Sequence, residues 1–281
     1  MAFRFRHSIC NECFVDWEIE DTCRAVKKAG YEGIEIAPFT LSDQPAAIPA
    51  SRRREVARII RDEGLQFVGL HWLMVAPAGL HVTTPDVALR GKSWRHIYDL
   101  VDLCADLDAG HEGTRVMVFG SPKQREALPG VSIEEAAKRF EDGLAGVAGH
   151  AQDRGVVILV EALPRNQCNI VNTLDEAVRI VHAIGSPAVQ TMFDTHNAID
   201  ETEPHAEVVG RFARHLRHVH VNEVDGGHCG AGDYDFKPVL RKLRDLEYPG
   251  WVSLEAFDFK PGGERIAGES LRYLEREITL L

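Results

Sequence analysis

The sequence predicts a single (β/α)₈ barrel, of the TIM barrel class, spanning residues 1–281. Short apolar runs that suit strands alternate eight times with longer amphipathic runs that suit helices. This alternation is typical of parallel strands joined by helical crossovers. Runs such as Val156–Val160 are apolar throughout, as expected for strands covered on both faces. No Pro- or Ser-rich linker divides the chain, which favours one closed barrel over an open sheet in two domains.

The strands are placed on the apolar runs and the helices on the amphipathic segments between them. We expect strands near Phe3–Ile9, Gly33–Ala37, Gln66–Trp72, Thr114–Gly120, Val156–Glu161, Val189–Asp194, Arg217–Asn222 and Trp251–Glu255. We expect helices near Ile19–Ala29, Ser51–Asp62, Pro85–Leu107, Ser132–Gln152, Thr173–Ile184, Glu203–His215, Phe236–Leu246 and Gly263–Glu277. Ser132 and Thr173 are each followed by Glu at the third position, which is typical of a helix start. Gly30, Gly64, Gly155 and Gly185 follow periodic segments, as C-terminal caps do.

The composition disfavours a nucleic-acid-binding protein, a membrane protein and a disulfide-bonded protein. A formal net charge of -11 disfavours nucleic acid as a partner. No run approaches the roughly 20 apolar residues that span a bilayer, so we expect no membrane contact and a cytoplasmic location. The 6 cysteines are scattered through a long chain, which predicts reduced thiols rather than disulfides. Cys10-Asn-Glu-Cys13 has no second pair to complete a zinc site and is interpreted as a structural thiol pair.

Acidic or imidazole residues close four of the later strand-like runs. They are Glu161, Asp194, His220 and Glu255, each about one βα unit from the next. In a barrel these positions share the rim at the C-terminal ends of the strands, where active sites are built. A single strand-end acid could equally cap a neighbouring helix, but four in matching positions predict a metal site. Three carboxylates and one imidazole suit Mn²⁺ first, with Mg²⁺, Co²⁺ or Zn²⁺ as alternatives.

Several motifs resemble those of the xylose isomerase-like sugar isomerase/epimerase superfamily, near its D-tagatose/ketose 3-epimerase branch. They are Glu161-Ala-Leu-Pro-Arg165, Phe193-Asp-Thr-His196, His218-Val-His-Val-Asn-Glu223 and Tyr248-Pro-Gly-Trp-Val-Ser-Leu-Glu255. The resemblance implies one divalent cation held by Glu161, Asp194, His220 and Glu255. It also implies that Glu161 and Glu255 are catalytic and move a proton on the carbon beside a carbonyl. The expected partner is a small sugar or sugar phosphate, with a homodimer as the possible assembly.

Six further residues are candidates for substrate binding: His71, Trp72, Arg165, His196, Asn197 and His228. Trp72 is either a platform for the apolar face of a sugar or a partly buried barrel aromatic. Arg165 either holds a substrate oxygen or forms a structural salt bridge. His196 and Asn197 both lie near the place where the epimerase branch supplies a substrate-contacting His, and spacing from His220 favours Asn197. His228 either replaces a basic residue of that branch or is a loop histidine.

Two long loops are expected on the same rim, Val75–Thr84 and Ser121–Val131, as lids or substrate loops. Within the second loop, Lys123 and Arg125 either bind a substrate phosphate or are simply solvated.

Three rival functions remain open. A dehydratase of cyclic polyols such as inositol derivatives would use a similar site with one metal. An endonuclease acting at abasic sites in DNA shares the barrel but needs further histidine ligands, whereas the fourth strand ends in Val118-Phe-Gly-Ser121. A barrel that binds sugar without turning it over would not need the paired acids Glu161 and Glu255.

Overall fold

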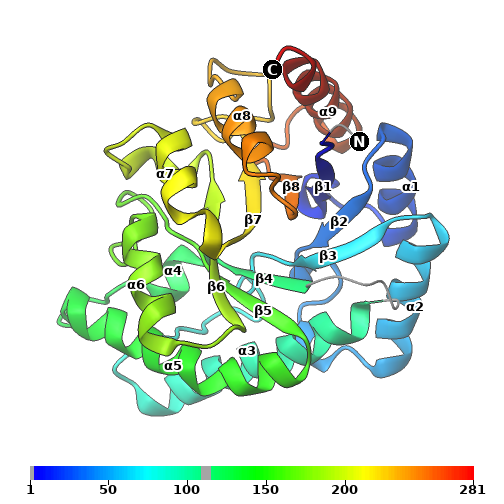
Figure 1. Cartoon of the computed structure of the whole chain (residues 1–281). Helices are drawn as coiled ribbons and strands as arrows, with labels where there is room; N and C mark the ends of the chain where they lie inside the picture. Colours follow the sequence, from blue (N-terminus) through cyan, green and yellow to red (C-terminus); the bar gives the residue numbers. More distant parts are fainter. Residues whose placement is uncertain (1–2, 109–114) are drawn as a thin grey trace.

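Eight parallel strands close into a barrel in the order of the sequence (Figure 1). The computed structural model describes residues 3–108 and 115–281. The strands are β1 (Arg6–Cys10), β2 (Gly33–Ile36), β3 (Gln66–Leu70), β4 (Arg115–Phe119), β5 (Val156–Val160), β6 (Val189–Asp194), β7 (Leu216–Val221) and β8 (Trp251–Leu254). The first and last strands pair side by side, with Ile9 opposite Leu254. The predicted fold class is therefore confirmed.

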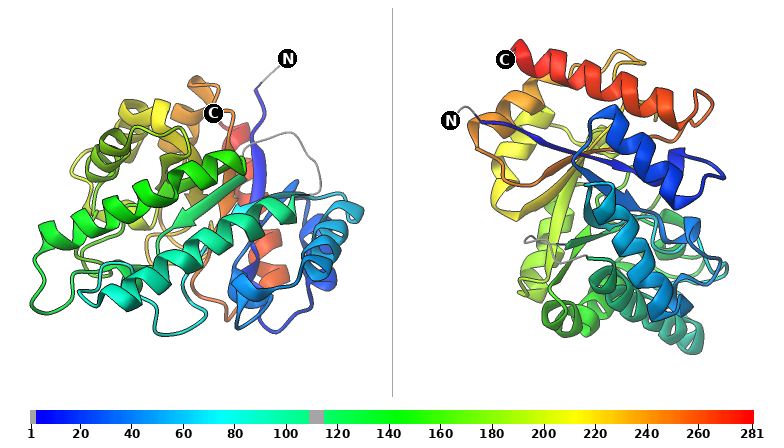
Figure 2. Two further views of the ribbon diagram at one scale, coloured as in Figure 1. Left: turned by 90° about the horizontal axis from the view of Figure 1, so that it is seen from below. Right: turned by 90° about the vertical axis from the view of Figure 1, so that its right-hand side faces the viewer.

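The helices surround the strands as an outer layer (Figure 2). They are α1 (Ile19–Ala29), α2 (Ala50–Asp62), α3 (Val87–Leu107), α4 (Pro122–Arg125), α5 (Ile133–Asp153), α6 (Leu174–Ile184), α7 (His205–Phe212), α8 (Lys237–Asp245) and α9 (Gly263–Thr279). Helix α9 packs against α1, which closes this layer where the two ends of the chain meet. Across the described residues, no helix has both the length and the apolar character needed to cross a bilayer.

Most predicted boundaries fall within two residues of the structure, and three differences bear on the site. The strand expected at Gln66–Trp72 ends at Leu70, because the backbone of Trp72 takes a positive φ of 50° that no strand accommodates. The loop expected at Ser121–Val131 contains the short helix α4. The helix expected at Glu203–His215 begins at His205 and ends in a 3₁₀ turn over Ala213–His215. Thr114, the expected start of the fourth strand, lies outside the described residues.

The barrel interior is filled by side chains at its N-terminal half, which leaves the other end for the site. The interior cluster consists of Val68, Val116, Val118, Leu159, Met192 and Trp251. The guanidinium of Arg6 lies 3.9 Å above the ring of Trp251 and caps the cluster. All strands run in the same direction, so the residues that follow them meet at the opposite rim.

Gly69 sets the spacing between β3 and β4. A Cβ added at Gly69 would lie 2.1 Å from the carbonyl oxygen of Val116, so the strands would have to move apart. We expect Gly69→Ala to lower the free energy of unfolding by about 1–3 kcal/mol, as overpacking does. Gly149→Ala is the control, since nothing lies within 4 Å of a Cβ there and alanine favours helix α5. Urea unfolding measures both, and equal stability of the two variants would contradict this account.

Candidate metal centre

Four side chains converge at the C-terminal rim of the barrel. Glu161 follows β5, Asp194 ends β6, His220 lies near the end of β7, and Glu255 follows β8. One ligand atom from each of the four lies within 4.8 Å of the others, and all four residues are buried. The structure therefore brings the four predicted ligands together. Their binding of a metal remains a prediction.

The imidazole of His220 is fixed from both sides. Its Nδ1 lies 3.0 Å from Oε2 of Glu255 and 3.6 Å from Oδ2 of Asp194. Its Nε2 lies 3.2 Å from Oε2 of Glu35, a fully buried acid at the end of β2. A histidine that donates one ring N–H to a carboxylate presents the other nitrogen to a metal. Glu35 thus orients His220 so that Nδ1 faces the other ligands.

The buried charges of the cluster fit a cation. Burial, followed by the charges of Glu255 and Asp194, raises the pKa of Glu161 to about 8. Burial also raises the pKa of Glu255 above its ordinary range. Burial alone would lower the pKa of His220, but the surrounding charges, led by that of Glu35, raise it well above its ordinary value. In the metal-free site, bound protons offset the negative charges of these buried groups. A divalent cation would offset the same charges.

Glu161 is held by three neighbours. Asn197 Nδ2 donates a 2.9 Å hydrogen bond to Glu161 Oε1. Gly120 leaves room for the other oxygen, because a Cβ at this position would lie 2.2 Å from Glu161 Oε2. Arg125 Nη2 donates to the backbone oxygen of Glu161 at 2.7 Å. The carboxylate therefore has one defined position in the pocket.

A cavity of about 310 Å³ opens onto Glu161 and Glu255. Trp72 forms one wall, and its indole Nε1 donates a 2.8 Å hydrogen bond to Glu255 Oε1. The Trp72 ring stacks on Phe257, another lining residue, with 5.9 Å between ring centroids and a 12° angle. A pocket with an aromatic wall and a few convergent polar groups is typical of a small-molecule site. Each of the two acids is thus held by a hydrogen bond from a neighbouring side chain.

The predicted substrate residues divide into two groups. Trp72 and Asn197 line the cavity. The other four bond elsewhere: His71 Nε2 to Glu12 (2.6 Å), Arg165 to Asp200 (3.6 Å), His196 Nδ1 to the Val224 oxygen (2.6 Å), and His228 Nε2 to Glu269 (3.1 Å). Arg165 is therefore in the salt bridge that was one of its two expected roles. None of these four is among the residues that line the described cavity.

The expectation that Arg125 is solvated was wrong. The side chain is fully buried and donates to the backbone oxygens of Phe119 and Glu161. The cause is helix α4, which turns Arg125 inward beneath the rim. Lys123 remains exposed at the edge of the cavity, 3.7 Å from Glu126.

Sequence reasoning missed two buried acid–histidine pairs next to the cluster. Glu35 Oε1 lies 2.6 Å from His218 Nε2, and Glu12 Oε2 lies 2.6 Å from His71 Nε2. Glu12 lies within the Cys10-Asn-Glu-Cys13 motif, whose sequence interpretation rested on its two cysteines alone. Both cysteines are free and buried, and Cys13 Sγ donates to the backbone oxygen of Cys10 at 3.6 Å. An acid two residues after the end of the first strand was the available signal.

Removing the charge of Glu35 is expected to weaken metal binding. Glu35→Gln keeps the shape of the side chain but loses the carboxylate that orients His220, and such substitutions cost about 10–100-fold in metal affinity. Glu32→Gln, at an exposed surface pair with Arg4, is the control. Isothermal titration of the metal-free proteins with Mn²⁺ measures both. Unchanged affinity in Glu35→Gln would show that His220 needs no such support.

The chain is similar to a family of TIM barrels and to several sugar epimerases. The family model described as "Xylose isomerase-like TIM barrel" matches residues 23–277. An L-ribulose 3-epimerase of Methylomonas sp. (strain DH-1) is 26% identical over 86% of this chain and 80% of its own length. An L-ribulose 3-epimerase of Mesorhizobium japonicum is 27% identical over 85% and 76%. Among solved structures, a 3-keto-D-glucoside 4-epimerase from E. coli superposes with a TM-score of 0.82 and 22% identity, covering 97% of this chain and 100% of that one.

Proposed function

The chain belongs to the xylose isomerase-like TIM barrel family and is an isomerase-class enzyme similar to the ketose 3-epimerases, and we propose that it epimerises a ketose with one bound divalent metal. We propose Mn²⁺ as this metal, with Mg²⁺, Co²⁺ or Zn²⁺ as alternatives. The observation that carries the proposal is the pair of buried carboxylates, Glu161 and Glu255, that line one cavity and are each held by a hydrogen bond. Paired acids of this kind suit the removal and return of a proton.

Glu161, Asp194, His220 and Glu255 would hold the cation. A cation bound there would supply electrostatic stabilisation for the negative charge that develops on the substrate oxygen next to the reacting carbon.

The protein's own groups would carry the proton. One of the two carboxylates takes the proton from the carbon beside the ketone, and the other returns a proton to the opposite face, which inverts that centre. Asn197 and Trp72 keep the two acids at fixed places while the substrate reacts. Phe257 and Trp72 give the pocket an apolar wall on one side.

A substrate without phosphate suits the cavity better than a sugar phosphate. Lys123 supplies the one cationic side chain among the described residues that line it, and this lysine is exposed. Arg125, the other candidate for a phosphate, is occupied by backbone oxygens. Phosphate recognition is typically built from several charge-assisted hydrogen bonds.

The direct test is exchange of the substrate proton with solvent. The metal-loaded protein is incubated in D₂O with L-ribulose, D-fructose and D-tagatose, and NMR follows the carbon next to the ketone. The proposal expects deuterium at that carbon together with the epimeric ketose. An aldose product would mean isomerisation, and a dicarbonyl formed by loss of water would mean a dehydratase. No exchange with any ketose in the metal-loaded protein would overturn the proposal.

A further inference from the structure

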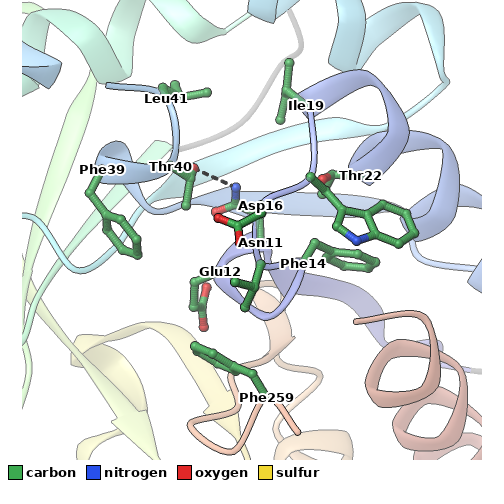
Figure 3. Close-up of a pocket in the computed structure, with 12 residues that line it drawn as sticks. Asn11, Glu12, Phe14, Asp16, Ile19, Thr22, Phe39, Thr40, Leu41 and Phe259 are labelled. Atoms are coloured by element: carbon green, nitrogen blue, oxygen red, sulfur yellow. Dashed lines mark hydrogen bonds between the residues drawn. The ribbon is translucent and has the colours of Figure 1, made fainter. Parts of the chain in front are cut away.

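A second hollow adjoins the cavity that contains Glu161 and Glu255. It has a volume of about 350 Å³ and lies between the segment after β1 and the segment after β2 (Figure 3). Its lining includes Asn11, Glu12, Phe14, Trp17, Phe39 and Phe259. The volume falls in the range of ligand-binding pockets, about 300–1,000 Å³. Nothing in the proposed chemistry uses this hollow.

The two hollows meet at Trp72 and at a pair of carboxylates. The ring of Trp72 stacks on Phe39 of the second hollow at 5.9 Å and on Phe257 of the reaction cavity at 5.9 Å. A carboxylate oxygen of Glu12 lies within 4.8 Å of one of Glu255. The two hollows are therefore neighbours on either side of Trp72.

Glu12 gives the second hollow an unused hydrogen-bond acceptor. The side chain is buried, with 3% of its surface exposed, and its Oε2 bonds to His71. Its Oε1 has no hydrogen-bond partner among residues 3–108 and 115–281. Figure 3 shows the carboxylate directed toward the ring of Phe259. A buried carboxylate oxygen without a partner is costly, and a hydroxyl donor from a ligand would satisfy it.

Aromatic side chains also line this hollow. Phe14 and Trp17 pack edge to face with 5.4 Å between their centroids, and 43% of the Trp17 surface is exposed. Asn11 is already fixed: its Oδ1 accepts from the Ala37 N–H at 2.7 Å, and its Nδ2 donates to Thr40 Oγ1 at 2.8 Å. Flat apolar walls, one free buried acceptor and a rigid floor suit a ring that carries both C–H faces and hydroxyl groups.

We propose that this hollow binds a second sugar ring, so that the substrate is a glycosylated ketose rather than a free monosaccharide. The inference rests on the proposed function for the ketose part and adds the class of group attached to it. The ketose unit occupies the cavity of Glu161 and Glu255. The glycosyl unit lies against the aromatic walls, and one of its hydroxyl groups donates to Glu12 Oε1.

Two measurements test the subsite on the metal-loaded full chain. Methyl α-D-glucopyranoside carries a sugar ring but no ketone, and saturation-transfer NMR with the Mg²⁺-loaded protein measures its binding. Lactulose and isomaltulose are ketoses that carry a glycosyl ring, and D-fructose lacks it. The ratio of kcat/KM for each disaccharide to that for D-fructose is measured by deuterium incorporation.

Trp17→Ala removes an exposed wall of the hollow, so the variant is expected to fold. We expect the glucoside to bind the wild type and to bind at least tenfold more weakly to Trp17→Ala. The disaccharide-to-fructose ratio is expected to fall at least tenfold in the same variant. Val87→Ala trims an exposed apolar side chain at the start of α3 that lines neither hollow, and both readouts should stay at wild-type values. Glu12→Gln, which keeps the side-chain shape, should weaken glucoside binding as well.

The outcomes separate the subsite from the reaction. Glucoside binding that is absent, or that is the same in Trp17→Ala as in the wild type, overturns the subsite even where ketoses exchange normally. A disaccharide-to-fructose ratio that Trp17→Ala leaves unchanged also overturns it. Glucoside binding that depends on Trp17 while no ketose exchanges would support the subsite and remove the proposed epimerisation.

Discussion

Glu161→Gln is expected to reduce deuterium exchange at the substrate carbon by roughly 10²–10⁴-fold, the usual contribution of a positioned general base. Glutamine keeps the length of the side chain and can still accept the hydrogen bond from Asn197, so the pocket should stay intact. What is lost is the group that takes or returns the proton. Single-turnover NMR in D₂O, with saturating metal, isolates this step from metal binding.

Glu255→Gln should have an effect of the same size, because inversion needs a group on each face of the substrate. Trp72 Nε1 can still donate to the amide oxygen of the substituted residue, so its position should hold. Glu264→Gln, an exposed acid in the first turn of α9, serves as the control and should exchange at the wild-type rate. Robust exchange in Glu161→Gln or in Glu255→Gln would remove that residue from its proposed role.

The ring of four candidate ligands could be predicted because their place depends on strand ends alone. In a parallel barrel, every residue that closes a strand reaches the same rim, whatever the details of packing. Glu161, Asp194, His220 and Glu255 needed no further information to be brought together. The same rule placed Trp72 at the rim. Its positive φ and its hydrogen bond to Glu255 could not be predicted from the sequence pattern.

The supporting contacts could not be predicted because they join strands that are distant in sequence. Glu35 meets His218 and His220 only after β1 closes against β8 and brings β2 close to β7. The burial of Arg125 depends on a helix of four residues, which is too short to give a periodic signal. Such contacts follow from the three-dimensional path of the chain, and local composition does not encode them.

Activity and stability should both depend on the bound cation. Stripping divalent metal with EDTA is expected to abolish turnover, and Mn²⁺ should restore it. Removal should also lower the midpoint of thermal unfolding, since a ligand present at about 1,000 times its Kd contributes about 4 kcal/mol to the folded state. The difference in unfolding midpoint between metal-loaded and metal-free protein is the quantity to compare, because the pH dependence of the rest of the protein is the same in both.

The size of this stability gap should grow with pH. Without metal, burial and neighbouring charges raise the pKa of Glu161 to about 8 and raise that of Glu255 as well. The folded state therefore gains stability from these protonated groups below the ordinary carboxyl pKa of about 4.5, and loses it as the pH rises toward 8. Bound metal replaces the protons, so its benefit should be small near pH 5 and large near pH 8.

Thermal unfolding of loaded and stripped protein at pH 5, 6.5 and 8 measures the gap. Glu161→Gln should flatten its pH dependence, because the variant has one fewer carboxyl group to ionise in the stripped state. An equal gap at all three pH values would mean that the cation does not bind among these buried acids. A second measurement adds Mn²⁺ to unbuffered metal-free protein at pH 7. Release of protons would show that the groups that bind the metal were protonated before it bound.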